Sequence, residues 1–341
     1  MITLASGRKI GAGLPPFVVA EIGSNWRTFD EAKDSISAAK ACGADAVKFQ
    51  LFGPRDLHGM IEGEPTAWAQ GMSVDVSGLV GMSPYLDPAW LPKLKAKADA
   101  CGIEFMCSAF SSELVAAVDP YVNVHKIASA EMTHVRILEA VRKTGKPVIL
   151  STGASGEADI LAALEVLKGA QVILLYCVAN YPAQAVDPRV IPLMAKQYGM
   201  PVGFSDHSVD ILTIPKAAAD HGACVIEKHV NFCELTDTPD APHSLLGDQF
   251  MLMVRNLKGD YPPNIGTHSE EVGMVLRHNR RLLATTDIGV GQTLQEGNNF
   301  GIYRSLKDEH HAYSPFMINE VAGRSAKRAI KAGDGIGPGD V

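Results

Sequence analysis

The sequence contains no apolar run of the about 18 residues that a membrane-spanning helix needs. Its N-terminus, MITLASGRKI, lacks the apolar core and the cleavage site of a signal peptide. The six cysteines show no CxxC spacing, and most lie beside apolar residues, so we expect reduced thiols and no disulfides. Together these absences predict a cytoplasmic protein without a membrane partner.

Positive charge is also scarce. The chain has 31 Lys and Arg against 38 Asp and Glu, a formal net charge of −7. No global basic field is available to attract nucleic acid, so we expect no nucleic-acid partner. An anionic small molecule would need a local cluster of Lys or Arg. The 341 residues are 46% hydrophobic, which is enough for a large buried core.

What the sequence does contain is a repeated alternation of short β-rich runs with longer amphipathic segments, which is typical of βα units around a parallel sheet. Eight such strands are predicted, at 17–23, 45–52, 104–110, 124–129, 147–153, 172–178, 201–208 and 224–230. Eight units predict a closed (β/α)8 TIM barrel of the α/β class, formed by residues 1–258.

Two segments interrupt this rhythm. Residues 53–86 form a connection too long and too rich in Gly and Pro for a plain βα loop, and such connections are usually functional covers or disordered segments. Residues 259–281 are polar, with Pro and Gly in their first half, and are predicted to be a linker. Residues 282–341 combine short strand-like pieces with many Gly turns, which indicates a separate small β-rich domain.

Nearly every predicted strand ends in a polar residue. In a TIM barrel the carboxyl ends of the strands open onto the active-site face, so such residues are candidates for catalysis or binding. Any single one is more simply explained as a satisfied polar side chain at a strand end. The candidates are Glu21, Asn25, Lys48, Gln50, Ser108, Lys126, Ser129, Glu131, Ser151, Thr152, Asn180, Tyr181, Ser205, Asp206, His207, Lys228 and His229.

Three of these candidates are lysines in apolar strands: Lys48, Lys126 and Lys228. An unpaired buried ammonium is costly, so each lysine either pairs with a carboxylate or faces an anionic ligand. Three lysines around one mouth favour an anion site, with serine hydroxyls and backbone N–H groups completing a phosphate or carboxylate cradle. One such lysine could instead form a Schiff base with a carbonyl substrate.

His207 and His229 end consecutive strands, which lie about 4.8 Å apart in a sheet, so both rings can reach one divalent ion. Two histidines suggest an open site completed by water, substrate or a carboxylate. Asp206 and Glu227 are candidates to orient the rings. Two histidines hydrogen-bonded at the barrel rim explain the spacing equally well.

The strand-end segments resemble those of a known family, in the family's order. They are VVAEIGSN, GADAVKFQ, HKIASAEM, TGKPVILSTG, CVANYPAQ, PVGFSDHS and VIEKHV. The family is that of the sialic acid synthases, which condense phosphoenolpyruvate with N-acetylmannosamine or a related sugar. The segments LLATTDIGVGQTL and GRSAKRAIKAGDGI are similar to its C-terminal antifreeze-like (SAF) domain.

The resemblance implies roles for residues of this chain. It assigns a divalent metal, usually manganese, to His207 and His229, and it places Glu21 and Glu131 as candidate general acid/base groups. The family's C-terminal domain reaches over the partner's barrel in a domain-swapped homodimer and contributes an arginine, which Arg304 would supply. The residues implied around phosphoenolpyruvate are Glu21, Lys48, Lys126, Ser129, Ser151 and Ser205, and those around the sugar are Gln50, Glu131, Tyr181 and Asp240.

The sequence departs from the family's pattern mainly toward the sugar. Trp26, Arg27 and Thr28 replace the usual His-Asn-Gly, and the usual Pro-Asp-His becomes Pro239-Asp240-Ala241, with His243 two places later. The segment after Arg304, RSLKDEHHAYSP, lacks the usual glycine. Two alternatives stay open at this point: a Schiff-base aldolase on the same fold and a carbohydrate-binding protein without activity.

Overall fold

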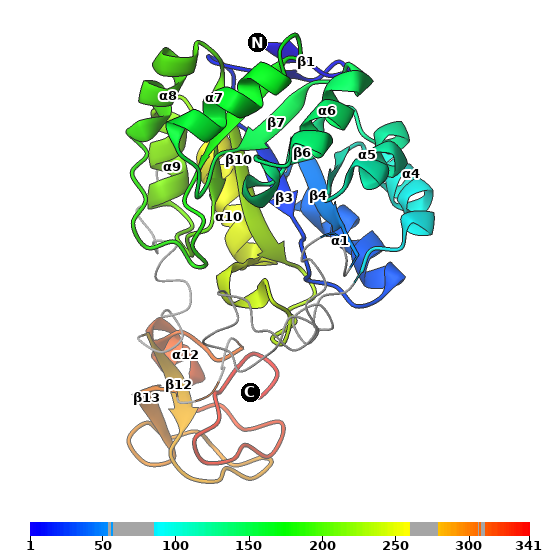
Figure 1. Ribbon diagram of the computed structural model, residues 1–341. Helices are drawn as coiled ribbons and strands as arrows, with labels where there is room; N and C mark the ends of the chain where they lie inside the picture. The colour runs from blue at the N-terminus through cyan, green and yellow to red at the C-terminus, as the bar shows by residue number, and fades with distance from the viewer. Residues whose placement is uncertain (54–55, 57–84, 260–278, 306, 308–310) are drawn as a thin grey trace, which may run out of the picture. The chain divides into compact units, whose positions relative to one another are not determined.

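The computed structural model describes residues 1–53, 56, 85–259, 279–305, 307 and 311–341. All eight predicted barrel strands are present. Each pairs in parallel with the next, and the last pairs with the first, which closes the barrel (Figure 1). The strands are β3 (Phe17–Glu21), β4 (Ala46–Leu51), β5 (Glu104–Ala109), β6 (His125–Ile127), β7 (Val148–Ser151), β8 (Val172–Cys177), β9 (Val202–Asp206) and β10 (Val225–Asn231). The predicted TIM barrel is therefore confirmed.

A helix follows every barrel strand and packs outside it. These helices are α1 (Phe29–Ala41), α4 (Leu91–Cys101), α5 (Ser112–Val118), α6 (Val135–Thr144), α7 (Glu157–Val166), α8 (Val190–Tyr198), α9 (Thr213–Asp220) and α10 (Gly247–Lys258). Short 3-10 turns lie at Pro88–Trp90, Asp119–Tyr121, Ser129–Glu131 and Ala241–His243, and β11 (Leu245–Leu246) pairs with β10.

Helix α1 shows how local sequence sets these boundaries. Thr28 and Glu31 form a capping box, in which the Thr28 side chain accepts from the Glu31 N–H and Glu31 accepts from the Thr28 N–H. Ala32, Ile36 and Ala39 form the buried face. The chain then turns at Gly43, whose φ of 86° suits glycine.

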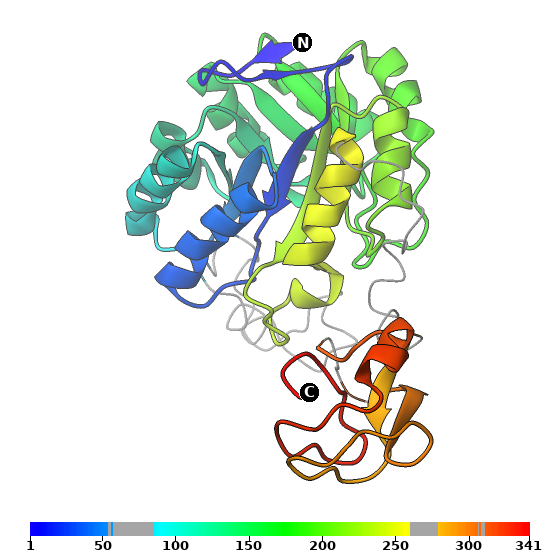
Figure 2. The same cartoon turned by 180° about the vertical axis from the view of Figure 1, so that it is seen from behind.

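The barrel has one apolar end. Strand side chains alternate between a core that faces the helices and a smaller core inside the barrel. A hairpin of β1 (Ile2–Thr3) and β2 (Lys9–Ile10) lies at the amino ends of the strands (Figure 2). Its side chains Ile2, Leu4 and Ile10 join the inner core beneath Phe17 and Val19. This hairpin therefore closes the barrel at the end opposite the predicted site.

The chain divides into two compact units, Met1–Tyr261 and Pro262–Val341. In the second unit β12 (Arg280–Ala284) pairs antiparallel with β13 (Phe300–Arg304), around a core that includes Leu282, Leu294 and Phe300. A turn at Pro315–Met317 and the short helix α12 (Ile318–Val321) complete the described part. The predicted fold class, a barrel followed by a β-rich region, is confirmed. The SAF-type identity of that region stays a prediction.

None of the helices among the described residues is long and apolar enough to cross a membrane. The long connection predicted at 53–86 and the linker predicted at 259–281 fall largely outside the described residues.

Candidate active site

The carboxyl ends of the strands carry a layer of polar side chains inside the barrel. Each member lies two positions after an inward-facing residue of the lower part of its strand, which is apolar in every strand except β9, where it is Gly203, so alternation points it to the interior. The layer consists of Glu21, Lys48, Ser108, Lys126, Ser151, Cys177, Ser205 and Glu227, and all are buried. The sequence prediction of a polar mouth is therefore matched by this layer.

Two carboxylates and two ammonium groups meet in this layer. Glu227 Oε1 lies 3.3 Å from Lys126 Nζ, and Glu227 Oε2 lies 3.7 Å from Lys48 Nζ. Lys48 also pairs with Glu21, which accepts a hydrogen bond of 2.7 Å from Gln50 Nε2. The two charges of each sign balance within one buried network.

Burial alone would raise the pKa of Glu227, but Lys126 and Lys48 outweigh it and lower the pKa to about 2. Burial lowers the pKa of Lys126 and, together with the Glu227 charge, raises the pKa of Glu21. Glu227 therefore stays ionised, while the buried ammonium of Lys126 is destabilised.

Serine hydroxyls surround this network. Lys126 Nζ donates to Ser151 Oγ at 2.8 Å, and Ser205 Oγ donates to Glu227 Oε1 at 3.1 Å. Ser108 Oγ and Glu227 Oε2 are buried without a hydrogen-bond partner. Because unpartnered buried polar atoms are costly, they indicate a surface that a polar ligand completes.

Above the layer lies a cluster of aromatic rings. The Tyr181 ring stacks on His207 with centroids 4.1 Å apart, and the His229 and His243 centroids lie 4.8 Å apart. The His207 and His229 centroids are separated by 5.8 Å. Burial lowers the pKa of His207 to about 4 and that of His229 to about 3, so both imidazoles are neutral near pH 7 and competent as metal ligands.

Asp240 is fixed beside these rings by the loop after β3. Its Oδ2 accepts from the Ser24 N–H at 2.7 Å and from Ser24 Oγ at 2.9 Å. A Cβ on Gly23 would lie 2.2 Å from the same oxygen, and Gly23 has a φ of 54°, so only glycine fits there. The loop therefore sets the position of the Asp240 carboxylate.

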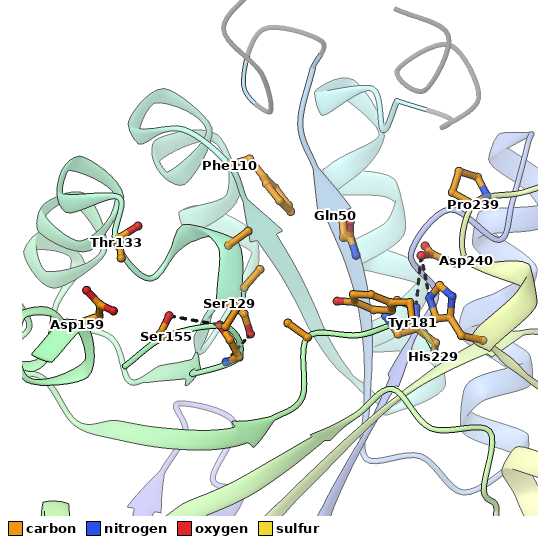
Figure 3. Close-up of a pocket in the computed structure, with 16 residues that line it drawn as sticks. Gln50, Phe110, Ser129, Thr133, Ser155, Asp159, Tyr181, His229, Pro239 and Asp240 are labelled. Atoms are coloured by element: carbon orange, nitrogen blue, oxygen red, sulfur yellow. Dashed lines mark hydrogen bonds and ion pairs between the residues drawn. The ribbon is translucent and has the colours of Figure 1, made fainter. Parts of the chain in front are cut away.

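These groups border a pocket of about 460 Å3 in the first unit. Figure 3 shows Tyr181, His229 and Asp240 at one end and Thr133, Ser155 and Asp159 at the other. Of the predicted site residues, the pocket lining includes Gln50, Ser129, Tyr181, His229 and Asp240. Glu21, Lys48, Lys126, Ser151 and Ser205 are buried in the polar layer.

Two predicted site residues lie apart from the network. Glu131 ends the turn Ser129–Glu131 and is buried, and burial raises its pKa to about 7. Arg304 ends β13 in the second unit and is exposed. Its predicted role at a neighbouring barrel stays a prediction.

Two sequence-based interpretations were wrong. Lys228 does not face the mouth, because strand alternation turns it to the outer wall, where its ammonium binds Asp206 Oδ2 at 2.6 Å. Asp206 is thereby engaged with Lys228 and does not orient His207. Glu227 likewise bonds to Ser205 and the lysines of the inner layer rather than to the histidines.

His243 is the residue that sequence reasoning passed over. In the sequence its displacement from the usual Pro-Asp-His position is only a departure from the family's pattern, yet the ring lies against His229 and Asp240. The signal was a histidine three residues after Asp240 in a turn, which brings the two side chains to the same side.

The fold and the site define a TIM barrel with a pocket at the open end and a buried layer of charged and hydroxyl side chains inside the strands. A sequence model of the NeuB family matches residues 35–260, so the chain belongs to the NeuB family. The sequence resemblance to the sialic acid synthases, and with it the prediction of a synthase enzyme, is confirmed.

Individual relatives agree with this assignment. The chain is 31% identical to N,N'-diacetyllegionaminic acid synthase of Legionella pneumophila, over 75% of this chain and 76% of that protein. It is 27% identical to pseudaminic acid synthase of Helicobacter pylori, over 96% and 98%. It is similar in structure to the sialic acid synthetase of Leptospira borgpetersenii, with a TM-score of 0.66, 27% identity, and coverage of 80% and 94%.

Proposed function

We propose that this protein condenses phosphoenolpyruvate with an N-acetylmannosamine-type sugar to give a sialic acid-type nonulosonate and phosphate. The observation that carries the proposal is the buried layer of Lys48, Lys126 and Glu227, whose polar atoms are incompletely satisfied, beneath a sugar-sized pocket. The names of the NeuB-family relatives support the class of product.

The polar layer suits phosphoenolpyruvate because its ammonium and hydroxyl groups match an anion. Lys48, Lys126, Ser129, Ser151 and Ser205 would hold the phosphate and carboxylate, with Glu21 beside them. Gln50, Glu131, Tyr181 and Asp240 would address the sugar. Gln50 links the two groups, since it lines the pocket and donates to Glu21.

In this reaction a carbon–carbon bond forms between the methylene of phosphoenolpyruvate and the aldehyde carbon of the open-chain sugar. The positive carbon left behind takes water, and the resulting intermediate expels phosphate by cleavage of a carbon–oxygen bond. Glu131, with its pKa raised to about 7 by burial, is suited to gain and lose a proton near neutral pH. Lys126 and Lys48 offset negative charge as it develops.

A divalent ion, with manganese as the expected metal, would polarise the sugar aldehyde when bound. The site fits such an ion, because His229 Nδ1 is buried without a hydrogen-bond partner and the imidazole is neutral near pH 7. His207 and His229 are the ligands that the sequence predicts.

The experiment is a screen of mannosamine-type sugars, including deoxy and diacetamido forms, scored by phosphate released from phosphoenolpyruvate. Reactions without acceptor are the control. Phosphoenolpyruvate labelled with 18O in the bridging oxygen should deliver that label to phosphate. Two outcomes would contradict the proposal: phosphate release in the absence of any acceptor sugar, and no phosphate release with any of the sugars.

A Schiff-base aldolase is the second candidate, because burial lowers the pKa of Lys126 and thereby favours the free amine. Borohydride would trap a carbonyl substrate on the lysine in that case, and it should leave the chain unmodified under the proposed condensation.

We also propose a domain-swapped homodimer in which Arg304 completes the partner's site. Mixing a His207→Ala chain with an Arg304→Ala chain should then restore activity toward half of wild type per heterodimer. A mixture that stays inactive would place the arginine in its own subunit's site.

A further inference from the structure

The turn 238–244, in which the chain departs from the family's pattern, forms part of one end of the pocket. Pro239, Asp240 and His243 all line the pocket, and Figure 3 shows Pro239 and Asp240 at the same end of it. Three backbone hydrogen bonds close the turn, at 3.2 to 3.3 Å, longer than the about 3 Å that is typical. Its position therefore depends on contacts with the rest of the barrel.

The side chain of Asn25 binds both ends of this turn. Its Oδ1 accepts from Thr238 Oγ1 at 2.7 Å, and its Nδ2 donates to Ser244 Oγ at 2.8 Å and to the Val230 carbonyl oxygen at 3.2 Å. Asn25 is fully buried, and Thr238 is 6% exposed. A carboxylate of the same shape could not donate the two Nδ2 bonds, and an apolar side chain could make none of the three.

The loop that carries Asn25 also binds the middle of the turn. Asp240 Oδ2 accepts from the N–H and Oγ of Ser24, and the Asp240 N–H donates to Ser24 Oγ at 3.1 Å. Ser244 Oγ donates to the Asp240 carbonyl oxygen at 2.6 Å. Asp240 is thus held at its carboxylate, its amide and its carbonyl group. We call Ser24, Asn25, Thr238 and Ser244 the loop clamp.

The loop clamp is separate from the buried polar layer. Among the described residues, no hydrogen bond joins a side chain of the clamp to a side chain of that layer. Lys126 and Ser151 bond to each other within the layer. A change in the clamp can therefore move Asp240 while the lysines keep their positions.

We propose that Asn25 and Thr238 are positioning residues, whose hydrogen bond holds Asp240 where the acceptor sugar binds. Neither of the two belongs to the pocket lining that the described residues form, so both act through the turn. The inference rests on the proposed function in taking Asp240 as a contact of the acceptor. A displacement of about 1 Å in such a contact can cost on the order of 100-fold in rate.

The test compares Thr238→Val with Thr238→Ser. Valine keeps the shape of threonine without its hydroxyl, so Asn25 Oδ1 loses its donor, whereas serine keeps the donor. Thr238→Val should lower kcat/KM for the acceptor sugar about 10- to 100-fold. Thr238→Ser should stay within about threefold of wild type, as should the matched control Thr236→Val at an exposed position in the same segment.

Phosphoenolpyruvate binding separates positioning from a general loss of structure. Its Kd, measured by calorimetric titration, should change less than about threefold in Thr238→Val, because the clamp and the polar layer share no hydrogen bond. A loss of phosphoenolpyruvate affinity as large as the loss in acceptor kcat/KM would overturn the proposal. Acceptor kinetics that are unchanged in Thr238→Val would overturn it as well.

Amide hydrogen exchange measures the turn itself, without any substrate. The Ser24 and Asp240 N–H groups both bond across the clamp, so both should exchange at least about tenfold faster in Thr238→Val and at wild-type rates in Thr238→Ser. Unchanged exchange in Thr238→Val would contradict the clamp. If circular dichroism shows that Thr238→Val does not fold, Ser244→Ala takes its place, because it removes the other bond from Asn25 to the turn.

These outcomes are separable from those of the proposed function. A wild-type protein that releases no phosphate with any sugar would contradict the condensation, and the exchange rates would still decide whether the loop clamp holds Asp240. Phosphate release with exchange rates and acceptor kinetics that are insensitive to Thr238→Val would contradict the clamp alone.

Discussion

The ends of β9 and β10 carry buried charges on both faces of the barrel wall, and the charges on the two faces differ in their hydrogen-bond partners. On the outer face Lys228 binds Asp206 Oδ2, the Ser208 and Asp210 carbonyl oxygens and Ser208 Oγ, at 2.5 to 3.3 Å. On the inner face Glu227 Oε2 has no hydrogen-bond partner. Ser108 Oγ, on β5 in the same layer, also lacks a hydrogen-bond partner.

The difference lies in one step along a strand. Glu227 and Lys228 are adjacent in β10, but strand side chains alternate between faces. Glu227 therefore points into the barrel, and Lys228 points toward the helices. The protein itself satisfies the outer charges, whereas the inner layer keeps unpartnered polar atoms that a ligand would complete under the proposed function. Three predictions test this division.

The largest effect is expected at the outer pair. Lys228→Met leaves the Asp206 carboxylate buried without its cation, and breaking a buried pair in this way costs about 3 to 5 kcal/mol of the free energy of unfolding. Urea denaturation measures the loss, with Lys216→Met as control because its pair with Asp220 is exposed. A loss below about 1 kcal/mol would contradict the structural role.

The second effect is expected at the inner lysine. Lys126→Met should weaken phosphoenolpyruvate binding by about 2 to 5 kcal/mol, because a buried anion loses a charge-assisted partner. Its effect on unfolding should be smaller than that of Lys228→Met, since Lys48 still faces Glu227. Calorimetric titration measures the affinity, with exposed Lys143→Met as control. Unaltered affinity would place the anion elsewhere.

The third and smallest effect concerns two buried carboxyl groups. Two lysines lower the pKa of Glu227 to about 2, whereas burial without a cation raises that of Glu131 to about 7. Folding therefore favours protonated Glu131, so its contribution is fully present below the unfolded value of 4.5 and is lost as pH rises through about 7.

Glu131→Gln should remove this dependence. Between about pH 5 and about pH 8 the variant should gain on the order of 1 to 3 kcal/mol in free energy of unfolding relative to wild type. Denaturation at both pH values measures the difference, with exposed Glu165→Gln as control. An identical pH dependence in variant and wild type would show that Glu131 titrates normally.

Much of the fold and of the inner layer could be predicted from the sequence. The apolar runs and their spacing are local signals, and the position of a polar residue at a strand end follows from the run itself. The face on which Lys228 lies could also be predicted, since in a strand its neighbours Glu227 and His229 both point to the opposite face. The prediction for Lys228 was wrong because it grouped three lysines at the mouth without assigning each side chain to the inner or the outer face of its strand.

The position of His243 could not be read in this way. His243 lies within the irregular segment 232–244, where no period sets the direction of a side chain. Its place depends on bonds to a loop more than 200 residues earlier, from Asn25 to Ser244 Oγ at 2.8 Å, from Thr238 to Asn25 at 2.7 Å, and from Ser24 to Asp240. Such long-range contacts exist only once the barrel has closed.

The hairpin of β1 and β2 closes one end of the barrel, so the interior opens only at the carboxyl ends of the strands. Ile2, Leu4 and Ile10 seal its base, so every reactant and product passes through the same mouth. Lys126 and Ser151 are 4% and 2% exposed at the bottom of the passage, whereas Tyr181, 43% exposed, stands at its rim. For the proposed reaction this geometry predicts an ordered mechanism, in which the anion that binds the lysines enters before the sugar and the bound sugar covers it.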